Sequence, residues 1–302
     1  MNYKITLITI TSLLMLMSCT TQTINDNNSL LWKISGNGLD EPSFLFGTHH
    51  LVPVSFLDSI SGLEEAFENT KQTVGELDMA NMNEMQMKIM SEAVMPQGVT
   101  YESLISAEDV VLLDSALTNL LGIGLNQFGA LKPAMLSNLI SLTLYQKHYP
   151  SIANETNIDQ YFQMEALNRN RNVVGLETTE DQIEVLLNTR SLERQAELLM
   201  CMVRNQEMVM EQMDEFQDAY YTQNINLLYD LSIKETPDDP CPTTDEEMNE
   251  LNKDRNEKWL EKLPSIMEDK PSFIAVGCLH LPGDVGLIEG LREQGYTVEP
   301  VN

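Results

Sequence analysis

The stretch Phe273-Ile274-Ala275-Val276-Gly277-Cys278-Leu279-His280 indicates how this chain folds. An apolar run of strand length breaks at a glycine and is followed by a histidine. Phe44-Leu45-Phe46-Gly47-Thr48-His49-His50 repeats that order near the other end of the chain. Short apolar runs with such boundaries are typical of buried strands. The sequence therefore predicts a buried strand near each terminus, each leading into a loop that carries histidine.

Further segments extend this pattern into a complete domain. Apolar runs predict strands at 30–35, 73–77, 173–176 and 296–301, in addition to the two above. The residues between them, at about 81–171 and 179–263, have the spacing of helices. Strands at both ends with helices between them predict one α/β domain over residues 30–302. Its mixed central sheet is built from the N- and C-terminal strands and encloses a large helical insertion.

The first residues predict export. Lys4 precedes a short apolar run over 5–17, and Leu16-Met17-Ser18-Cys19 matches a lipoprotein box. The run is shorter than the roughly 20 apolar residues of a membrane-spanning helix. We expect residues 1–18 to be a lipoprotein signal peptide and residues 19–29 to form a tether. Cys19 would then be acylated and would anchor the protein to a membrane, on the periplasmic or cell-surface side; the alternative is an uncleaved signal or a fortuitous cysteine.

The charge of the chain limits its partners. The net charge is −28, and removal of residues 1–18, which hold one lysine and no acid, makes it 17 − 46 = −29. Nucleic acids and anionic membrane surfaces are bound by clustered lysine and arginine. Nucleic acid is therefore not an expected partner.

Export also affects the remaining cysteines, because disulfides persist in oxidising compartments. Cys201 lies in a helical stretch and Cys241 lies in a proline-rich loop, and we predict that these two pair. The alternative is that both are free and buried. Cys278 would then be left without a partner.

The predicted strands end on residues that can do chemistry. His50 and His280 follow two strands, and Glu76 ends another. In open α/β sheets, ligands and catalytic groups gather beyond the carboxyl ends of strands, where a glycine lets the backbone turn and leaves room for a bound group. Two imidazoles and one carboxylate predict a site for a divalent metal, or an acid–base set without a metal. A single histidine after a strand is usually an ordinary loop residue, and although the repetition of the motif argues against that interpretation here, residue types alone leave both open.

Methionines form two clusters, at 79–95 and at 200–213. Met79-x-x-Met82-x-x-Met85 has the spacing of exported segments that bind Cu(I). We favour the alternative, in which the methionines belong to the helical core or to an adaptable substrate groove.

The two histidine motifs together resemble the TraB/GumN family, which includes the animal Tiki proteins. The resemblance rests on Gly47-Thr48-His49-His50 with Val276–Gly283, and it covers the chain from Trp32 to Val301. Supporting matches are Glu76, Gly175-Leu176-Glu177-Thr178 with Gln182, Arg255-Asn256, 286–291 and 295–298. The resemblance implies the fold of the erythromycin esterases and of the haem-binding lipoprotein ChaN.

The Tiki branch is described as metal-dependent proteases that trim peptides, which implies a role for each matching residue here. His50, His280 and Glu76 would be the catalytic residues and the ligands of a divalent metal (Mn, Co or Zn). Arg255 and Glu177 would be secondary residues that either orient the ligands or hold the insertion against the sheet.

Two positions depart from the family's motifs. His49 stands beside His50 in the first motif, although the spacing favours His50. Cys278 occupies a position where a small residue is common. This cysteine would be a ligand or a nucleophile, or, as we favour, a buried and inert residue.

We therefore expect a metal-dependent hydrolase, a peptidase that acts on exported peptides or proteins. The alternatives are a lipoprotein that binds a peptide or haem without turnover, and a metal-free hydrolase resembling the esterases.

Overall fold

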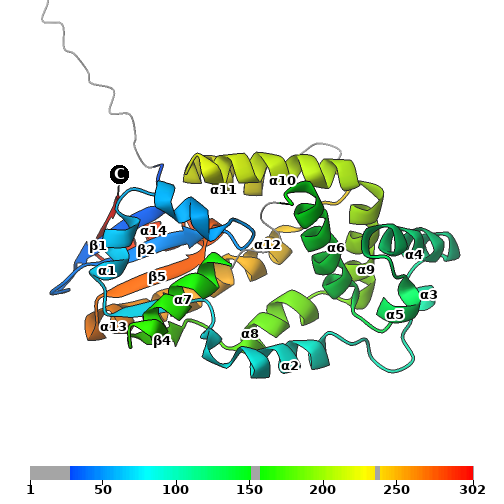
Figure 1. The fold of residues 1–302 in the computed structure, drawn as a ribbon, viewed down its shortest axis with the longest axis horizontal. Coiled ribbons are helices and arrows are strands. Elements are labelled where there is room, and N and C mark those ends of the chain that lie inside the picture. Colours follow the sequence, from blue (N-terminus) through cyan, green and yellow to red (C-terminus); the bar gives the residue numbers. More distant parts are fainter. Residues whose placement is uncertain (1–27, 151–156, 235–238, 302) are drawn as a thin grey trace, which may run out of the picture.

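A single mixed sheet forms the centre of the computed structural model, which describes residues 28–150, 157–234 and 239–301 (Figure 1). Its strand order is β4-β3-β5-β2-β1-β6. The strands are β1 (Leu31–Gly36), β2 (Ser43–Thr48), β3 (Gln72–Gly75), β4 (Asn172–Gly175), β5 (Ser272–Gly277) and β6 (Tyr296–Pro300). The prediction of a mixed α/β sheet with a helical insertion is confirmed.

The middle of the sheet is parallel and one side is antiparallel. β5 pairs in parallel with both β2 and β3, and β3 pairs in parallel with β4, whereas β1 pairs antiparallel with β2 and β6. All six residues of β2 are buried, as are the first five of β5. Strands that are covered by helices on both faces need continuous apolar runs, which is why 44–46 and 273–276 do not alternate with polar residues.

Helices occupy most of the chain between the strands. Their bounds are α1 (Leu63–Glu68), α2 (Met82–Glu92), α3 (Tyr101–Leu104), α4 (Ala107–Leu121), α5 (Leu125–Phe128), α6 (Pro133–His148), α7 (Ile158–Asn168), α8 (Thr179–Ile183), α9 (Leu192–Arg204), α10 (Gln206–Tyr221), α11 (Ile225–Ile233), α12 (Asp245–Leu251), α13 (Lys253–Asp269) and α14 (Leu287–Glu293). Short 3-10 turns also occur, including one at Cys278–His280 directly after β5.

Two apolar cores cover the two faces of the sheet. On one face, Phe162 of α7 packs against Phe46 and Phe273, with ring centroids 5.6 and 4.6 Å apart. On the other face, α13 contributes Trp259, Leu263 and Met267, which recur at a spacing of four residues and so lie on one side of the helix. The interval predicted as an insertion thus includes two helices, α7 and α13, that cover the sheet itself.

A group of helices beyond the sheet forms a lobe with its own core, seen to the right of the sheet in Figure 1, whereas α1 and α14 belong to the two cores that cover the sheet. Buried residues of α3, α4, α6 and α9 meet there, among them Tyr101, Leu113, Ile140 and Leu199. α2 differs from these helices because none of its residues is buried; its Met87 is 67% exposed. The methionines of α2 are therefore not core residues, and for them only the other expectation, an adaptable groove, stays a prediction.

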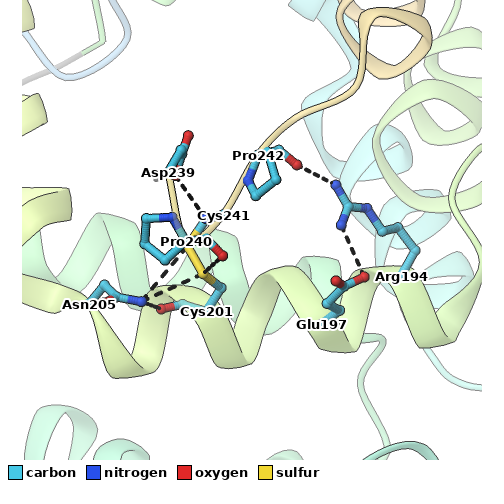
Figure 2. Close-up of a disulfide and its surroundings, with 8 residues drawn as sticks. All are labelled: Arg194, Glu197, Cys201, Asn205, Asp239, Pro240, Cys241 and Pro242. Carbon is cyan, nitrogen blue, oxygen red and sulfur yellow. Dashed lines mark hydrogen bonds and ion pairs between the residues drawn. A yellow bond between two sulfur atoms is a disulfide. The ribbon is translucent and has the colours of Figure 1, made fainter. Parts of the chain in front are cut away.

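A disulfide joins the lobe to the loop that leads back to the sheet (Figure 2). Cys201 of α9 and Cys241, the pair predicted from the sequence, are bridged with their Cα atoms 5.7 Å apart. Asp239 Oδ1 accepts a hydrogen bond from the N–H of Cys241, and Arg194 Nη2 donates to the carbonyl of Pro242 at 2.6 Å. The bridge therefore fixes the start of the segment that runs through α12 into α13.

The predicted signal peptide at 1–18, the lipidation site Cys19 and most of the tether at 19–29 lie outside the described residues. Export and anchoring therefore remain predictions. Within the described ranges, no helix has both the length and the apolar composition needed to cross a bilayer.

Candidate functional site

Four neighbouring strands end at one edge of the sheet, and this edge carries the candidate site. Thr48 of β2 pairs with Gly277 of β5, and Gly75 of β3 pairs with Ala275 and Gly175. Because these strands are parallel, the chain leaves each of them on the same side, where open α/β sheets place their functional loops. The residues that follow the four strands include every residue predicted for this site except Arg255.

The two motif glycines are needed because other groups approach them closely. A β-carbon on Gly47 would lie 3.0 Å from the Cα of Cys278, and one on Gly277 would lie 3.2 Å from Oε1 of Glu76. The N–H of Gly277 also donates to that oxygen at 2.9 Å. The room that we expected the glycines to leave for a bound group is thus filled by the protein itself.

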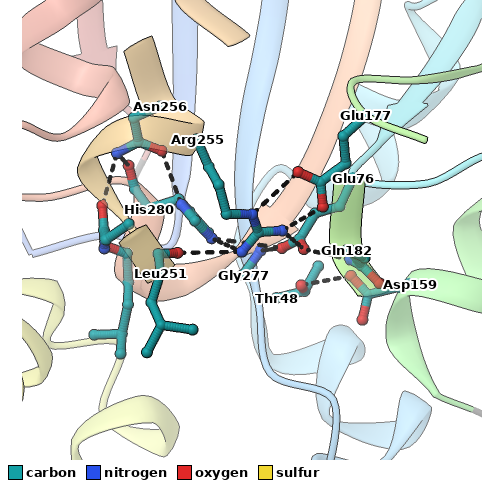
Figure 3. A network of polar contacts seen from close by, with 12 residues as sticks. Thr48, Glu76, Asp159, Glu177, Gln182, Leu251, Arg255, Asn256, Gly277 and His280 are labelled. Atoms are coloured by element: carbon teal, nitrogen blue, oxygen red, sulfur yellow. Dashed lines mark hydrogen bonds and ion pairs between the residues drawn. The ribbon is translucent and has the colours of Figure 1, made fainter. Parts of the chain in front are cut away.

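Arg255 of α13 lies at the centre of a buried charged cluster (Figure 3). Its Nη2 donates to Glu76 Oε2 and to Glu177 Oε1, both at 2.6 Å, and its Nε donates to Glu177 Oε2 at 3.1 Å. Its Nη1 donates to the carbonyl of Leu251 at 3.2 Å and faces Nε2 of His280 at 3.0 Å. These contacts use all of the guanidinium N–H groups. The guanidinium is therefore fixed between two carboxylates and an imidazole.

Charge keeps Glu76 ionised despite its burial. Burial by itself would raise the pKa of this carboxyl, but His280, Arg255 and His50 lie close enough to lower it to about 2. Gln182 adds a hydrogen bond from its amide to Glu76 Oε2 at 3.2 Å. Both oxygens of Glu76 are thus occupied by donors of the protein.

His280 is held in one tautomer by Asn256. The side-chain N–H₂ of Asn256 donates to Asn252 and to the carbonyls of His280 and Val285, so its oxygen is the acceptor that faces Nδ1 of His280 at 2.8 Å. Nδ1 therefore carries the proton, and the lone pair of Nε2 points at Arg255. Burial lowers the pKa of His280 to about 4, which leaves the ring neutral at pH 7.

His50 differs from His280 because it is accessible. Its Nδ1 lies 2.7 Å from Oδ2 of Asp159, and 59% of its side chain is exposed. The other carboxylate oxygen of Asp159, on α7, accepts from the hydroxyl of Thr48 at 2.6 Å. The charge of Asp159 raises the pKa of His50 to about 9, and Glu76 acts in the same direction. The structure thus presents an imidazole that is held through Nδ1 and is otherwise largely exposed.

His49 and Cys278, the other two candidates in the motifs, are packing residues. The ring of His49 lies 5.3 Å from the ring of Tyr220 and 5.7 Å from that of Phe216, and its Nδ1 accepts from the N–H of Leu51. Burial lowers the pKa of His49 to about 4. Cys278 is buried, and desolvation raises the pKa of its thiol to about 12, so it is neither a thiolate ligand nor a nucleophile at neutral pH.

Sequence reasoning missed Asp159 and did not assign roles to Asn256 and Gln182. The sequence around Asp159 does not indicate a functional role, because an acid in the first turn of a helix is common. Asn256 and Gln182 stood among the residues on which the family resemblance rested, and their contacts with His280 and Glu76 now give them a physical role.

The predicted metal ligands, His50, Glu76 and His280, do not fit a metal as they are arranged. Nε2 of His280 and Oε2 of Glu76 both face the Arg255 guanidinium, and a fixed positive charge disfavours a second cation in the same place. Among the residues that the structure describes, no three His, Cys, Asp or Glu side chains are close enough together to hold a metal ion. Acid–base chemistry of the side chains themselves is what this arrangement supports.

A cleft of about 1140 Å³ borders the site beside α10, α11 and α12. One of its lining residues, Phe216, is the residue that packs on His49, and another, Asn252, is bonded to Asn256. The cleft therefore adjoins both histidine motifs, although His50 and His280 themselves are not part of its lining. Its apolar lining includes Leu198, Met202, Met208, Phe216, Tyr229 and Ile233.

A comparison with known protein families gives a match over most of the chain. A family model described as TraB/PrgY/gumN matches residues 30–300, which span the whole sheet and the helices between its strands. No curated protein and no solved structure matched the chain.

Proposed function

Because this chain belongs to the TraB/PrgY/gumN family, we propose that it is a hydrolase whose proton-transfer residue is His50. The observation that supports this proposal most strongly is the pair of His50 with Asp159. The carboxylate holds Nδ1 at 2.7 Å and is itself fixed by Thr48, while the ring remains open to solvent. An imidazole oriented through one nitrogen and exposed through the other is the usual arrangement of a general base.

The chemical step that follows is proton transfer at Nε2 of His50. A water molecule attacks the carbonyl carbon of the substrate and gives a proton to this nitrogen. The same proton then passes to the leaving group as the carbonyl–heteroatom bond breaks. Because the pKa of His50 is near 9, only a small fraction of the ring is neutral at pH 7. Hydrolysis should therefore become faster as the pH rises towards 9.

The substrate class proposed is a peptide. The resemblance of the two motifs to the Tiki branch suggests it, and the cleft beside the site supports it. Its volume of about 1140 Å³ exceeds the upper end of the range for small-molecule pockets, about 1,000 Å³. Flexible methionines such as Met202 and Met208 line it, and such side chains adapt to varied apolar groups. We place the side chains of a bound peptide here, with the bond to be cleaved next to His50.

The place of action is part of the same proposal. If residues 1–18 are a lipoprotein signal peptide, Cys19 anchors the protein to a membrane and the substrates are exported peptides or proteins. The Cys201–Cys241 disulfide supports an oxidising compartment, since disulfides persist there.

The test uses the purified chain and a library of fluorescence-quenched peptides, with and without a metal chelator. We expect hydrolysis that is lost in His50→Ala. The control is His148→Ala, which removes another partly exposed histidine paired with an acid, Asp214, and which should not change the rate. Full turnover by His50→Ala would refute the assignment. Peptide binding without cleavage would instead favour the non-catalytic alternative.

A further inference from the structure

Three helices form walls of the cleft beside the site, and all three are acidic. α10 carries five acidic residues, α11 carries one and α12 carries four, and none of these helices contains a lysine or an arginine. The whole chain has a net charge of −28, so the rest of the molecule does not reverse this sign. A cleft walled by one sign of charge concentrates ligands of the opposite sign. The walls of this cleft therefore favour a ligand of positive charge.

Two of these acids lie on the cleft itself and are unpaired. Glu215 of α10 and Asp245 of α12 line it, and both are exposed. Within the part of the chain that the structure describes, neither carboxylate forms an ion pair. Asp239 completes the acids of the lining, which also holds Lys234 and Lys253; the latter pairs with an acid of its own helix at 3.8 Å. Two carboxylates of the lining are thus available to cations of a ligand.

The cleft also presents apolar surface, which limits the ligand further. Ile233 and Val285 line it and are 53% and 42% exposed, so part of this apolar surface faces water. Met202, Met208 and Phe216 are half-buried in the same lining. A ligand that covers these residues with its own apolar groups removes both surfaces from water, which is favourable. The ligand should therefore combine apolar groups with positive charge.

We propose that this cleft binds cationic amphipathic peptides, in which lysine or arginine alternates with apolar residues. Their apolar side chains contact Met208 and Phe216, and their cationic side chains pair with Glu215 and Asp245. An acidic peptide is repelled by the walls, and an uncharged one leaves both carboxylates unpaired. Phe216 packs on His49, so a peptide bound here lies next to the first histidine motif. This inference rests on the proposed peptidase function and names its substrate class.

The test uses three matched fluorescent peptides in which leucine alternates with Lys, Gln or Glu. Fluorescence anisotropy measures their binding to His50→Ala, which lacks the proposed base, and their cleavage is measured with the wild type. In about 0.01 M salt the Lys peptide should bind at least about tenfold more tightly than the Glu peptide, because an exposed ion pair contributes up to about fivefold. In about 1 M salt, where charges act over only about 3 Å, this preference should fall below about threefold.

Glu215→Gln combined with Asp245→Asn should reduce the preference for the Lys peptide at least about fivefold. The matched control is Glu261→Gln with Glu268→Gln, which removes two exposed acids of α13 that do not line the cleft and should leave the preference unchanged. Equal binding of the three peptides in low salt, or binding of none, would overturn the proposal. An equal loss of preference in both double variants would also overturn it, since the overall charge and not the cleft would then select the peptide.

Binding and cleavage are read separately, so the two proposals can fail separately. A Lys peptide that binds preferentially to the cleft but is never cleaved by the wild type would refute the hydrolase and support the cleft assignment. Cleavage of all three peptides with no preference in binding would support the hydrolase and refute the substrate class.

Discussion

Replacement of Asp159 by asparagine should lower the pKa of His50 and disable the ring as a base. Asp159 is the largest cause of the rise of this pKa from 6.5 to about 9. The amide introduced by Asp159→Asn could keep the hydrogen bond from Thr48 through its oxygen and would then present its N–H₂ to Nδ1 of His50. That contact favours the tautomer with the proton on Nε2, which is the nitrogen that must accept it from water.

The magnitude follows from the charge and from the exposure of the ring. Loss of the carboxylate removes the largest of the causes that raise this pKa from 6.5 to about 9, while Glu76 still raises it and burial and Arg255 still lower it. Because 59% of the side chain is in solvent, screening reduces the measured change, and we expect a drop of about one to two units. The wrong tautomer should lower hydrolysis by a factor on the order of 10³–10⁴, as in other His–Asp pairs.

The assay is an NMR titration of the His50 ring from pH 5 to pH 10, assigned with His50→Ala. An unchanged pKa in Asp159→Asn would refute the argument that this carboxylate sets the charge of His50.

The pH dependence of stability gives a second measure of the same interaction. A raised pKa stabilises the fold fully below about 6.5, and this contribution is lost as the pH rises through 9. The loss of stability in the variant, about 1 kcal/mol after screening, should therefore shrink over that interval.

Three further changes test other parts of the structure. Cys201→Ser with Cys241→Ser opens a bridge that spans 40 residues, and urea unfolding should show a loss of about 4 kcal/mol if the chain-entropy model holds. Two arginines, Arg194 first, lower the pKa of Glu247 to about 2, so the wild type should lose stability as the pH falls from about 4.5 towards 2; Glu247→Gln should lack this part of the acid dependence. Gly47→Ala should destabilise the fold by about 1–3 kcal/mol in thermal unfolding, because the new carbon meets the backbone of Cys278, and a variant as stable as the wild type would refute that contact.

The position of the site could be predicted from the sequence because strand polarity determines it. Two apolar runs that each break at glycine were expected to be buried strands, and the structure pairs them in parallel from Phe44 with Phe273 to Thr48 with Gly277. Parallel pairing places the ends of both runs side by side. The two motifs therefore meet although more than 220 residues separate them, as His50 and His280 show.

The connections within the site could not be predicted in the same way. Asp159 reaches His50 because α7 packs on the sheet with its first turn above the end of β2, and no local pattern encodes that packing. Arg255 was expected to orient metal ligands, but its place between the two glutamates depends on Trp259 and Leu263 anchoring α13 to the opposite face. Both contacts are tertiary, so residue type and spacing alone do not reveal them.

The central place of β5 makes the candidate site depend on a strand that comes late in the chain. β5 lies between β2 and β3, so residues 272–277 must arrive before the two halves of the sheet can join. A chain that ends before Ser272 would retain only the two-stranded pieces β1–β2 and β3–β4, which are marginal in water. Pairings between such distant segments also form slowly. An incomplete or still unfolded chain therefore lacks the edge of the sheet at which the candidate site is assembled.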